Sequence, residues 1–236
     1  MLISKEIKFT PIPFFSVDPM YYPVPASSAI PYWYKKTNSY IGTNTKVYNH
    51  TANEFNQTIK KCIPVFDALS SGYIIPTYAD LWVSNNNFGK KIYSISNRNT
   101  YIPEHNFAQA PYHPASTGEP YPKLLNPWGI KTPKGYSCLF ITPVHHSNTY
   151  FSVLEGIVDT DTYNTGINFP FVLNDPTFEG LIPAGTPMVQ VIPFKREPWK
   201  STIDLSTDNI TNSERLMATK FYDRYKKLFW SKKEYK

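Results

Sequence analysis

Two acidic residues, Asp159 and Asp161, directly follow an aliphatic run in the segment GIVDTDTYNTG. A carboxylate at the end of a strand, beside a tight turn, can be held ionised as a general base that polarises a water for attack on phosphorus. Aspartate also commonly caps tight turns, so a purely structural role is the alternative. The residues alone leave both roles open.

A second group of candidate ligand-binding residues is the pair His145 and His146 in the segment HHSN. Either imidazole could contact a phosphate or a metal ion, but adjacent residues on a strand point to opposite faces and cannot easily hold one ion together. A turn at HHSN would relax this restriction. Because no cysteine is nearby and His105 and His113 are distant in the sequence, we expect no metal site.

The composition predicts the elements that must position these groups. Aromatic residues make up 16% of the 236 residues, and 22 prolines stand against 10 glycines. This favours short strands and proline-bounded turns over a helical bundle. With 41% hydrophobic and 18% charged residues, the chain fits neither a membrane protein nor a charge-rich disordered one.

The cellular setting is predicted from cysteine content and from the first residues. Cys62 and Cys138 allow at most one disulfide, and the opening residues MLISKEIKFTPIP contain no apolar stretch long enough for a signal peptide. We therefore expect a cytoplasmic protein without a transmembrane segment. If a phage encodes it, the host cytoplasm is the expected location, and a virion location stays open.

Most of the formal net charge of +6 lies near the C-terminus. Residues 213–236 contain six Lys and two Arg against three acidic residues. Ser213 is a plausible N-cap, and helical spacing predicts an amphipathic helix over 213–231 with the apolar stripe Met217, Phe221, Tyr225 and Leu228. The stripe either packs on the body of the protein, or this basic helix contacts a neighbouring subunit or a polyanion.

We predict a mainly β fold with a jelly-roll or clip-type core. Strand-like runs include GYSCLFITP, YFSVLEGIVD, GINFPFVLN and TPMVQVIPF, which is the spacing of an antiparallel sandwich or barrel. An irregular, proline-rich loop is expected over 97–127. The expected organisation is a single domain over 1–236, comprising an extended arm at 1–52, a helix, hairpin and long loop at 53–125, a β core at 126–196 and the C-terminal helix at 213–231.

The segment from Lys131 to Phe194 resembles the dUTPase and dCTP deaminase superfamily. KTPKGYSCLFITP is similar to the strand that leads to the second family motif, GIVDTDTYNTG to the third, and FEGLIPAGTPMVQVI to the fourth. The resemblance implies a dUTPase-like β-clip fold and trimers with sites at subunit boundaries. It covers about a quarter of the chain.

The resemblance also implies residue roles. It makes Asp159 the general base, with Asp161 beside it at the ligand, and places Tyr163 under the deoxyribose. Gln190 falls near the phosphates, and the backbone of a hairpin between Leu154 and Phe171 would bind the base edge. Two residue-level alternatives remain, since Tyr163 can be a packing residue and Gln190 can satisfy a backbone group. Mg²⁺ is the expected cofactor only if the site is hydrolytic.

The chain departs from the family at the phosphate-binding positions. Val144, His145 and His146 stand where the second motif has Arg-Ser or Ser-Ser, and Thr186 and Pro187 stand in the Gly-Asp-Arg positions of the fourth. Each missing charge-assisted bond to a triphosphate is worth about 1.5 to 3 kcal/mol. We therefore expect nucleotide binding with altered or lost nucleotide diphosphohydrolase activity.

A second hypothesis belongs to a different class. The stretches IPYWYKK and NPWGIKTPKGYSCLF resemble those of a group of phage and bacterial proteins. Together with the proline-rich arm and the missing phosphate-binding groups, this favours a structural or assembly protein, or one that sequesters a small molecule, built on the clip as a rigid platform.

Overall fold

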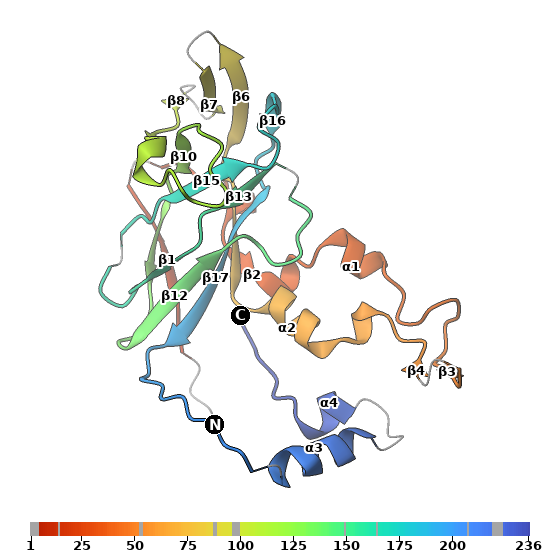
Figure 1. Ribbon diagram of the computed structural model, residues 1–236. Helices are drawn as coiled ribbons and strands as arrows, with labels where there is room; N and C mark the ends of the chain where they lie inside the picture. The colour runs from red at the N-terminus through yellow and green to blue at the C-terminus, as the bar shows by residue number, and fades with distance from the viewer. Residues whose placement is uncertain are drawn as a thin grey trace. The chain divides into compact units, whose positions relative to one another are not determined.

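The computed structural model describes residues 5–13, 15–51, 54–86, 89–95, 100–148, 150–163, 165–206, 208–218 and 224–236. Its contacts divide the chain into two compact units. Unit 1 comprises residues 1–31 and 69–196, and unit 2 comprises residues 32–68 and 197–236. The prediction of a mainly β protein is confirmed, because short antiparallel strands make up most of the regular structure (Figure 1).

Unit 1 is built around a five-stranded antiparallel sheet. Its order is β14 (Gly156–Val158), β12 (Tyr136–Ile141), β17 (Pro187–Lys195), β5 (Tyr73–Pro76) and β2 (Val24–Pro25). The long central pair runs from Tyr136 opposite Lys195 to Ile141 opposite Gln190, and these strands lie side by side in Figure 1. This pair sets the positions of several predicted site residues.

A four-stranded sheet packs against the same core. Its order is β13 (Phe151–Val153), β15 (Phe169–Leu173), β10 (Tyr121–Leu124) and β9 (Glu104–His105). Phe169 and Phe171 alternate with less buried neighbours along β15, as expected of a strand with one face in the core. The Phe140 and Phe169 rings, one from each sheet, have centroids 5.8 Å apart. The two sheets therefore share one apolar interior.

Another four-stranded sheet extends unit 1. It consists of β16 (Gly180–Ile182), β6 (Asp80–Asn86), β7 (Gly89–Ile95) and β8 (Thr100–Tyr101). β6 and β7 form the predicted hairpin, with Trp82 opposite Tyr93. Leu81, Val83 and Ile92 from this sheet are buried in the common core.

The first part of the predicted N-terminal arm, up to Pro31, belongs to unit 1, and residues 32–52 belong to unit 2. β1 (Lys8–Pro11) pairs with β11 (Trp128–Lys131), and β2 extends the five-stranded sheet. Two short 3₁₀ turns, η1 (Pro19–Tyr21) and η2 (Ala26–Ser28), connect these parts. The Tyr22 ring packs edge-on against Trp128 at 4.9 Å. The arm thus contributes strands as well as surface contacts.

Unit 2 contains the short helices. These are α1 (Tyr32–Lys36), most of α2 (Ile63–Ser70), α3 (Asp208–Ala218) and α4 (Arg224–Leu228), with η3 (Ile59–Lys61) and the β3 (Tyr48–Asn49) and β4 (Glu54–Phe55) pair. The indole N–H of Trp230 donates to both carboxylate oxygens of Asp67, at 3.1 and 2.8 Å, and Lys233 Nζ donates to the same carboxylate at 2.7 Å. These bonds join the two chain segments of unit 2.

Several local predictions need correction. The segment 97–127 is irregular only in part. Its described residues include β8, β9, η4 (Phe107–Gln109) and β10, whereas residues 110–120 contain no helix or strand. β10 tolerates Pro122 because its pairing partner changes within the strand. Tyr121 and Pro122 pair with β9, whereas Lys123 and Leu124 pair with β15. The missing N–H of Pro122 therefore does not fully interrupt either pairing. The run YFSVLEGIVD is two strands, β13 and β14, which belong to different sheets.

The helices also differ from their predicted bounds. The early helix begins only at Ile63, with Pro64 in its first turn, where a missing N–H is tolerated. Ser213 lies inside α3 and is not its N-cap. In the predicted apolar stripe, Phe221 lies outside the described residues, and Met217, Tyr225 and Leu228 remain 42, 39 and 51% exposed.

Candidate functional site

The predicted catalytic segment forms a tight corner at the end of β14. β14 pairs with β12, with Val158 opposite Cys138, and Asp159 is the first residue after the strand. The Asp159 carbonyl accepts hydrogen bonds from the Thr162 and Tyr163 N–H groups at 3.1 and 2.8 Å. The sequence motif is therefore a strand followed by a closed turn.

Arg196 holds both aspartates of this corner. Its Nη1 lies 3.1 Å from Asp159 Oδ1, and its Nη2 lies 2.5 Å from Asp161 Oδ2. The Gly135 N–H donates to Asp161 Oδ2 at 2.8 Å, and Ser137 Oγ donates to Asp159 Oδ1 at 2.6 Å. Sequence reasoning missed Arg196, which follows β17 and reaches the corner because β17 pairs with β12.

The two carboxylates have different surroundings. The Asp161 side chain is 3% exposed, whereas that of Asp159 is 60% exposed. Hydrogen bonds from Arg196, and then from the Gly135 N–H, lower the pKa of Asp161 to about 2. Asp161 thus acts as an ionised acceptor that holds the loop before β12, which is the turn-capping role left open by the sequence. Asp159 keeps an accessible carboxylate, with the Arg196 guanidinium 3.1 Å from its Oδ1.

The residues under the corner are buried and tied together. Thr160 is fully buried, its hydroxyl lies 2.8 Å from the Thr132 hydroxyl, and it donates to Cys138 Sγ at 3.3 Å. Burial raises the pKa of the Cys138 thiol to about 11, so the thiol stays protonated at neutral pH. These contacts fix the corner on the central sheet.

Gln190 is enclosed within unit 1. Its side chain is completely buried, its Nε2 donates to Ser71 O at 2.7 Å, and its Oε1 accepts from the Val144 N–H at 2.9 Å. The amide thus serves two backbone groups from different loops, as in the structural alternative. Gln190 and Arg196 are six residues apart in sequence, which along a strand corresponds to about 20 Å. One small ligand could not contact both.

The two histidines lie in a turn near Gln190, and not on a strand. His145 has a positive φ of 54° and is exposed, while the His146 N–H donates to Pro143 O at 3.2 Å. The His146 Nε2 is buried without a hydrogen-bond partner among the described residues, and burial lowers the pKa of this imidazole. The structure thus brings Asp159, Asp161 and the half-exposed Tyr163 together, and places the histidine turn at the other end of the β12–β17 pair.

The expected hairpin between Leu154 and Phe171 is closed at its base. β13 and β15 pair antiparallel with Val153 opposite Phe171, and the Leu154 N–H donates to Pro170 O at 2.8 Å. The chain between these two strands is not a simple turn, because β14 within it pairs with β12 of the other sheet.

The aspartate corner does not fit a Mg²⁺ site in this arrangement, because the Arg196 guanidinium occupies the oxygens that a cation would need. Among the described residues, no group of three His, Cys, Asp or Glu side chains could hold a metal ion. Nor does the described part of the chain contain a helix long and apolar enough to cross a membrane.

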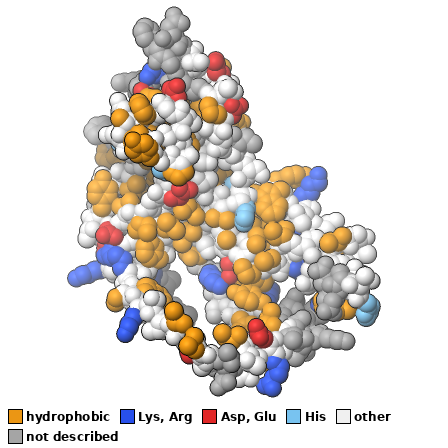
Figure 2. Space-filling model, viewed as in Figure 1, with side chains coloured by type: hydrophobic (Ala, Val, Ile, Leu, Met, Phe, Trp, Pro, Cys, Tyr) orange, Lys and Arg blue, Asp and Glu red, His pale blue; other side chains and the backbone are white. Residues whose placement is uncertain are grey.

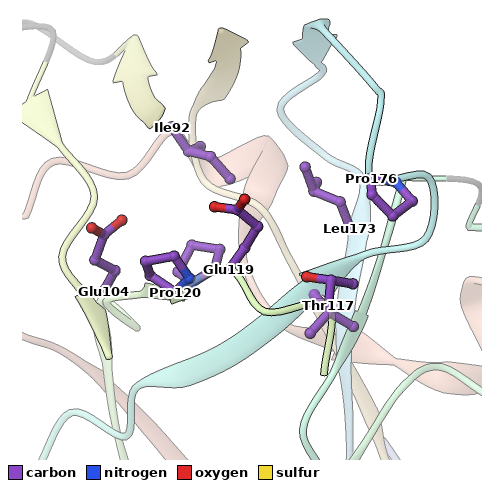
Figure 3. Close-up of a pocket in the computed structure, with 9 residues that line it drawn as sticks. Ile92, Glu104, Thr117, Glu119, Pro120, Leu173 and Pro176 are labelled. Carbon is purple, nitrogen blue, oxygen red and sulfur yellow. The ribbon is translucent and has the colours of Figure 1, made fainter. Parts of the chain in front are cut away.

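A shallow hollow elsewhere in unit 1 combines an apolar lining with a few polar side chains. The centre of a water molecule can occupy about 50 Å³ of it, and its volume is about 490 Å³ when space open to solvent is included. It lies where the β9–β10–β15 region meets β7 (Figure 3). Most of its wall is aliphatic or proline, and its polar side chains are Glu104, Glu119 and Thr117. The apolar lining residues are Ile92, Pro120, Pro122, Val172, Leu173 and Pro176.

The two glutamates give this hollow a negative character. Glu104 Oε1 is paired with Lys91 Nζ at 2.9 Å, and both side chains are about three-quarters buried. In Figure 3, Glu119 extends from the loop before Pro120 toward the region between Ile92 and Leu173. Sequence reasoning missed this site because its residues come from separate strands and loops and follow no short motif.

Comparison with known proteins gave no match to a protein-family model and none to a curated protein.

Proposed function

We propose that unit 1 is a small-molecule-binding module, and that its ligand combines an apolar body with an amino or other cationic group. The observation that supports this proposal is the pair of glutamates on the wall of an otherwise apolar hollow. It is the small-molecule branch of the second sequence hypothesis.

The chemistry of the lining favours a cationic ligand over a phosphorylated one. Aliphatic and proline side chains provide apolar contact area, while a few polar groups fix the orientation of a ligand. Glu119 is exposed and offers an acceptor for an ion pair, worth about 0.2 to 1 kcal/mol at such a site. Its carboxylate would repel a nucleoside triphosphate, whereas the charge of Glu104 is offset by Lys91, so we expect such a ligand to be disfavoured at this site.

Three probes of similar size and different charge test this proposal. We expect 2-phenylethylammonium to bind about two- to five-fold more tightly than 2-phenylethanol, because an ion pair with an exposed carboxylate is worth up to about 1 kcal/mol. The anion 3-phenylpropionate should bind weakest. Dissociation constants can be measured by ligand-observed NMR titration.

Two variants locate the effect. Glu119→Gln keeps the size of the side chain and removes its charge, so most of the preference for the cation should disappear. Glu155→Gln changes an exposed glutamate that does not line the hollow and should leave the preference unchanged. Equal binding of the three probes, or equal effects of both variants, would contradict the proposal.

A nucleotide-binding role at the aspartate corner is a second candidate, and it includes the dUTPase-like clip fold and trimeric assembly. The observation that favours it is the 60% exposed carboxylate of Asp159, beside the 51% exposed Tyr163. Because Arg196 lies against Asp159, we expect binding without ordinary hydrolysis. Calorimetric titration with deoxynucleotides and cyclic nucleotides, together with chromatography for products and light scattering for mass, tests each part of this candidate.

A further inference from the structure

The net positive charge of the protein comes from unit 2. By sequence, unit 2 has 14 Lys and Arg residues against 8 Asp and Glu, whereas unit 1 has 10 of each. The net charge of +6 therefore belongs entirely to unit 2. This partition goes beyond the C-terminal basic segment, because residues 32–68 also contribute five lysines.

Lysines from both segments of unit 2 line one broad hollow. Its volume is about 1070 Å³, counting the space open to solvent. Among the described residues of its wall, four are lysines and none is acidic. The wall consists of Lys46, Phe55, Gln57, Lys60, Lys61, Cys62, Ile63, Pro64, Met217, Tyr225 and Lys226. Figure 2 shows Lys and Arg side chains in blue on the face that it presents.

The lysine side chains are spread around aromatic rings. Lys46 Nζ lies 3.6 Å from the centroid of the Phe55 ring, and Lys61 Nζ lies 5.3 Å from that of Tyr40. Lys60 Nζ donates to the Lys35 carbonyl at 2.8 Å. The ring and carbonyl contacts orient these ammonium groups.

Two of the acidic residues of unit 2 form ion pairs with lysines outside the hollow. Asp67 accepts hydrogen bonds from Trp230 and Lys233, and Glu234 forms ion pairs with Lys232 and Lys236. These contacts lower the negative charge available to balance the lysines of the hollow. A concave wall with one sign of charge concentrates counter-ions of the opposite sign.

We propose that this basic hollow binds a short stretch of single-stranded nucleic acid, with the phosphates at Lys46, Lys60, Lys61 and Lys226. Phe55 and the 39% exposed Tyr225 offer rings on which unpaired bases can stack. A duplex is disfavoured, because the four lysines lie on a loop, on η3 and on the five-residue α4, and none lies on the eleven-residue α3 that could follow a groove. A membrane surface is disfavoured, because Lys46, Lys60 and Lys61 are half-buried in the wall of the hollow.

The salt dependence of oligonucleotide binding tests the proposal. Binding of fluorescein-labelled oligothymidylate of twelve nucleotides is followed by anisotropy between 50 and 200 mM NaCl. Each lysine–phosphate contact with a single strand adds about −0.7 to the slope of log K against log salt. The triple variant Lys46→Gln, Lys60→Gln and Lys226→Gln removes three such contacts. Its affinity at low salt should fall at least ten-fold, and the slope of log K against log salt should become shallower by about 2.

The control is the triple variant Lys36→Gln, Lys200→Gln and Lys236→Gln, which removes the same charge from unit 2 outside the hollow. Its affinity for the oligonucleotide should fall less than three-fold. Phe55→Leu should weaken binding several-fold while the salt slope stays unchanged, because it removes stacking alone. Unfolding curves establish that each variant is folded. Equal losses in both triple variants would overturn the proposal, as would stronger binding to duplex DNA or to vesicles of anionic phospholipid than to the single strand.

Discussion

Replacement of Gln190 by methionine should destabilise unit 1 without acting through any ligand. The amide is completely buried and joins β17 to two loops, through Ser71 O at 2.7 Å and the Val144 N–H at 2.9 Å. Methionine has a similar length but neither donates to the carbonyl nor accepts strongly from the N–H.

The magnitude follows from these two bonds. Loss of the acceptor for the Val144 N–H should cost about 1 to 3 kcal/mol, and loss of one hydrogen bond to Ser71 O about 1 kcal/mol. The free energy of unfolding should therefore fall by about 2 to 4 kcal/mol. For a unit of this size each kcal/mol lowers Tm by about 2 to 4 °C, so we expect a decrease of roughly 5 to 15 °C.

Thermal unfolding followed by circular dichroism measures the decrease in Tm. Amide hydrogen exchange adds a local readout, since the Val144 N–H should exchange faster in Gln190→Met. Gln109→Met is the matched control, because Gln109 is exposed in η4 of the same unit, and this variant should stay within about 0.5 kcal/mol of the original.

An unchanged Tm together with unchanged exchange at Val144 would refute the reasoning. A Gln190→Met protein that kept its stability but lost nucleotide binding would instead support the phosphate-contact role that the family resemblance implies.

Three further changes have defined outcomes. Gly72→Ala should lower Tm by several degrees, because φ is +73° and an added Cβ would lie 2.0 Å from the oxygen of a backbone carbonyl in β17. The pKa of Asp161 is about 2, below its ordinary value of 3.8. Its contribution to stability is therefore complete above about pH 4 and is lost as the pH falls toward 2. Arg196→Gln should reduce this acid dependence, as measured by denaturation at a series of pH values. Cys62 is exposed and Cys138 buried, so Ellman's reagent should modify one thiol in the folded protein and two in denaturant.

Each of these outcomes has a control. Gly118→Ala shares the positive φ, +82°, but has nothing within 4 Å of the added Cβ, so it should cost less than Gly72→Ala. Lys195→Gln removes a cation next to Arg196 in sequence and should keep most of the acid dependence. Rapid modification of both thiols under native conditions would contradict the burial of Cys138.

The sequence predicted the strands where a hydrophobic pattern decides the structure. Alternation and β-branched residues located β12, β15 and β17, because each has a face in the core. Proline content misled the assignment of β10, since proline is compatible with a strand when its neighbours carry the ladder. The division into two units was not predicted, because unit 2 is assembled from segments on either side of the β core.

The candidate sites show a similar limit. The motif correctly placed Asp159 at the end of a strand, but the partner of both aspartates is Arg196, which only the β12–β17 pairing brings to the corner. The hollow in unit 1 combines residues from β7, β9, β10 and β15. Such groupings depend on strand order and register, which local sequence patterns do not specify.

The discontinuity of unit 2 imposes an order on assembly. Trp230 and Asp67, which join its two segments, are 163 residues apart in the chain. Closing a flexible loop of this length costs about 4 kcal/mol of chain entropy, which a few helices and one bonded pair can hardly offset. Once unit 1 has folded, the intervening chain is no longer a random coil and most of that penalty disappears. During unfolding, unit 2 should therefore not remain folded after unit 1 has unfolded. Substitutions that unfold the core of unit 1 should also abolish binding at the lysine-lined hollow.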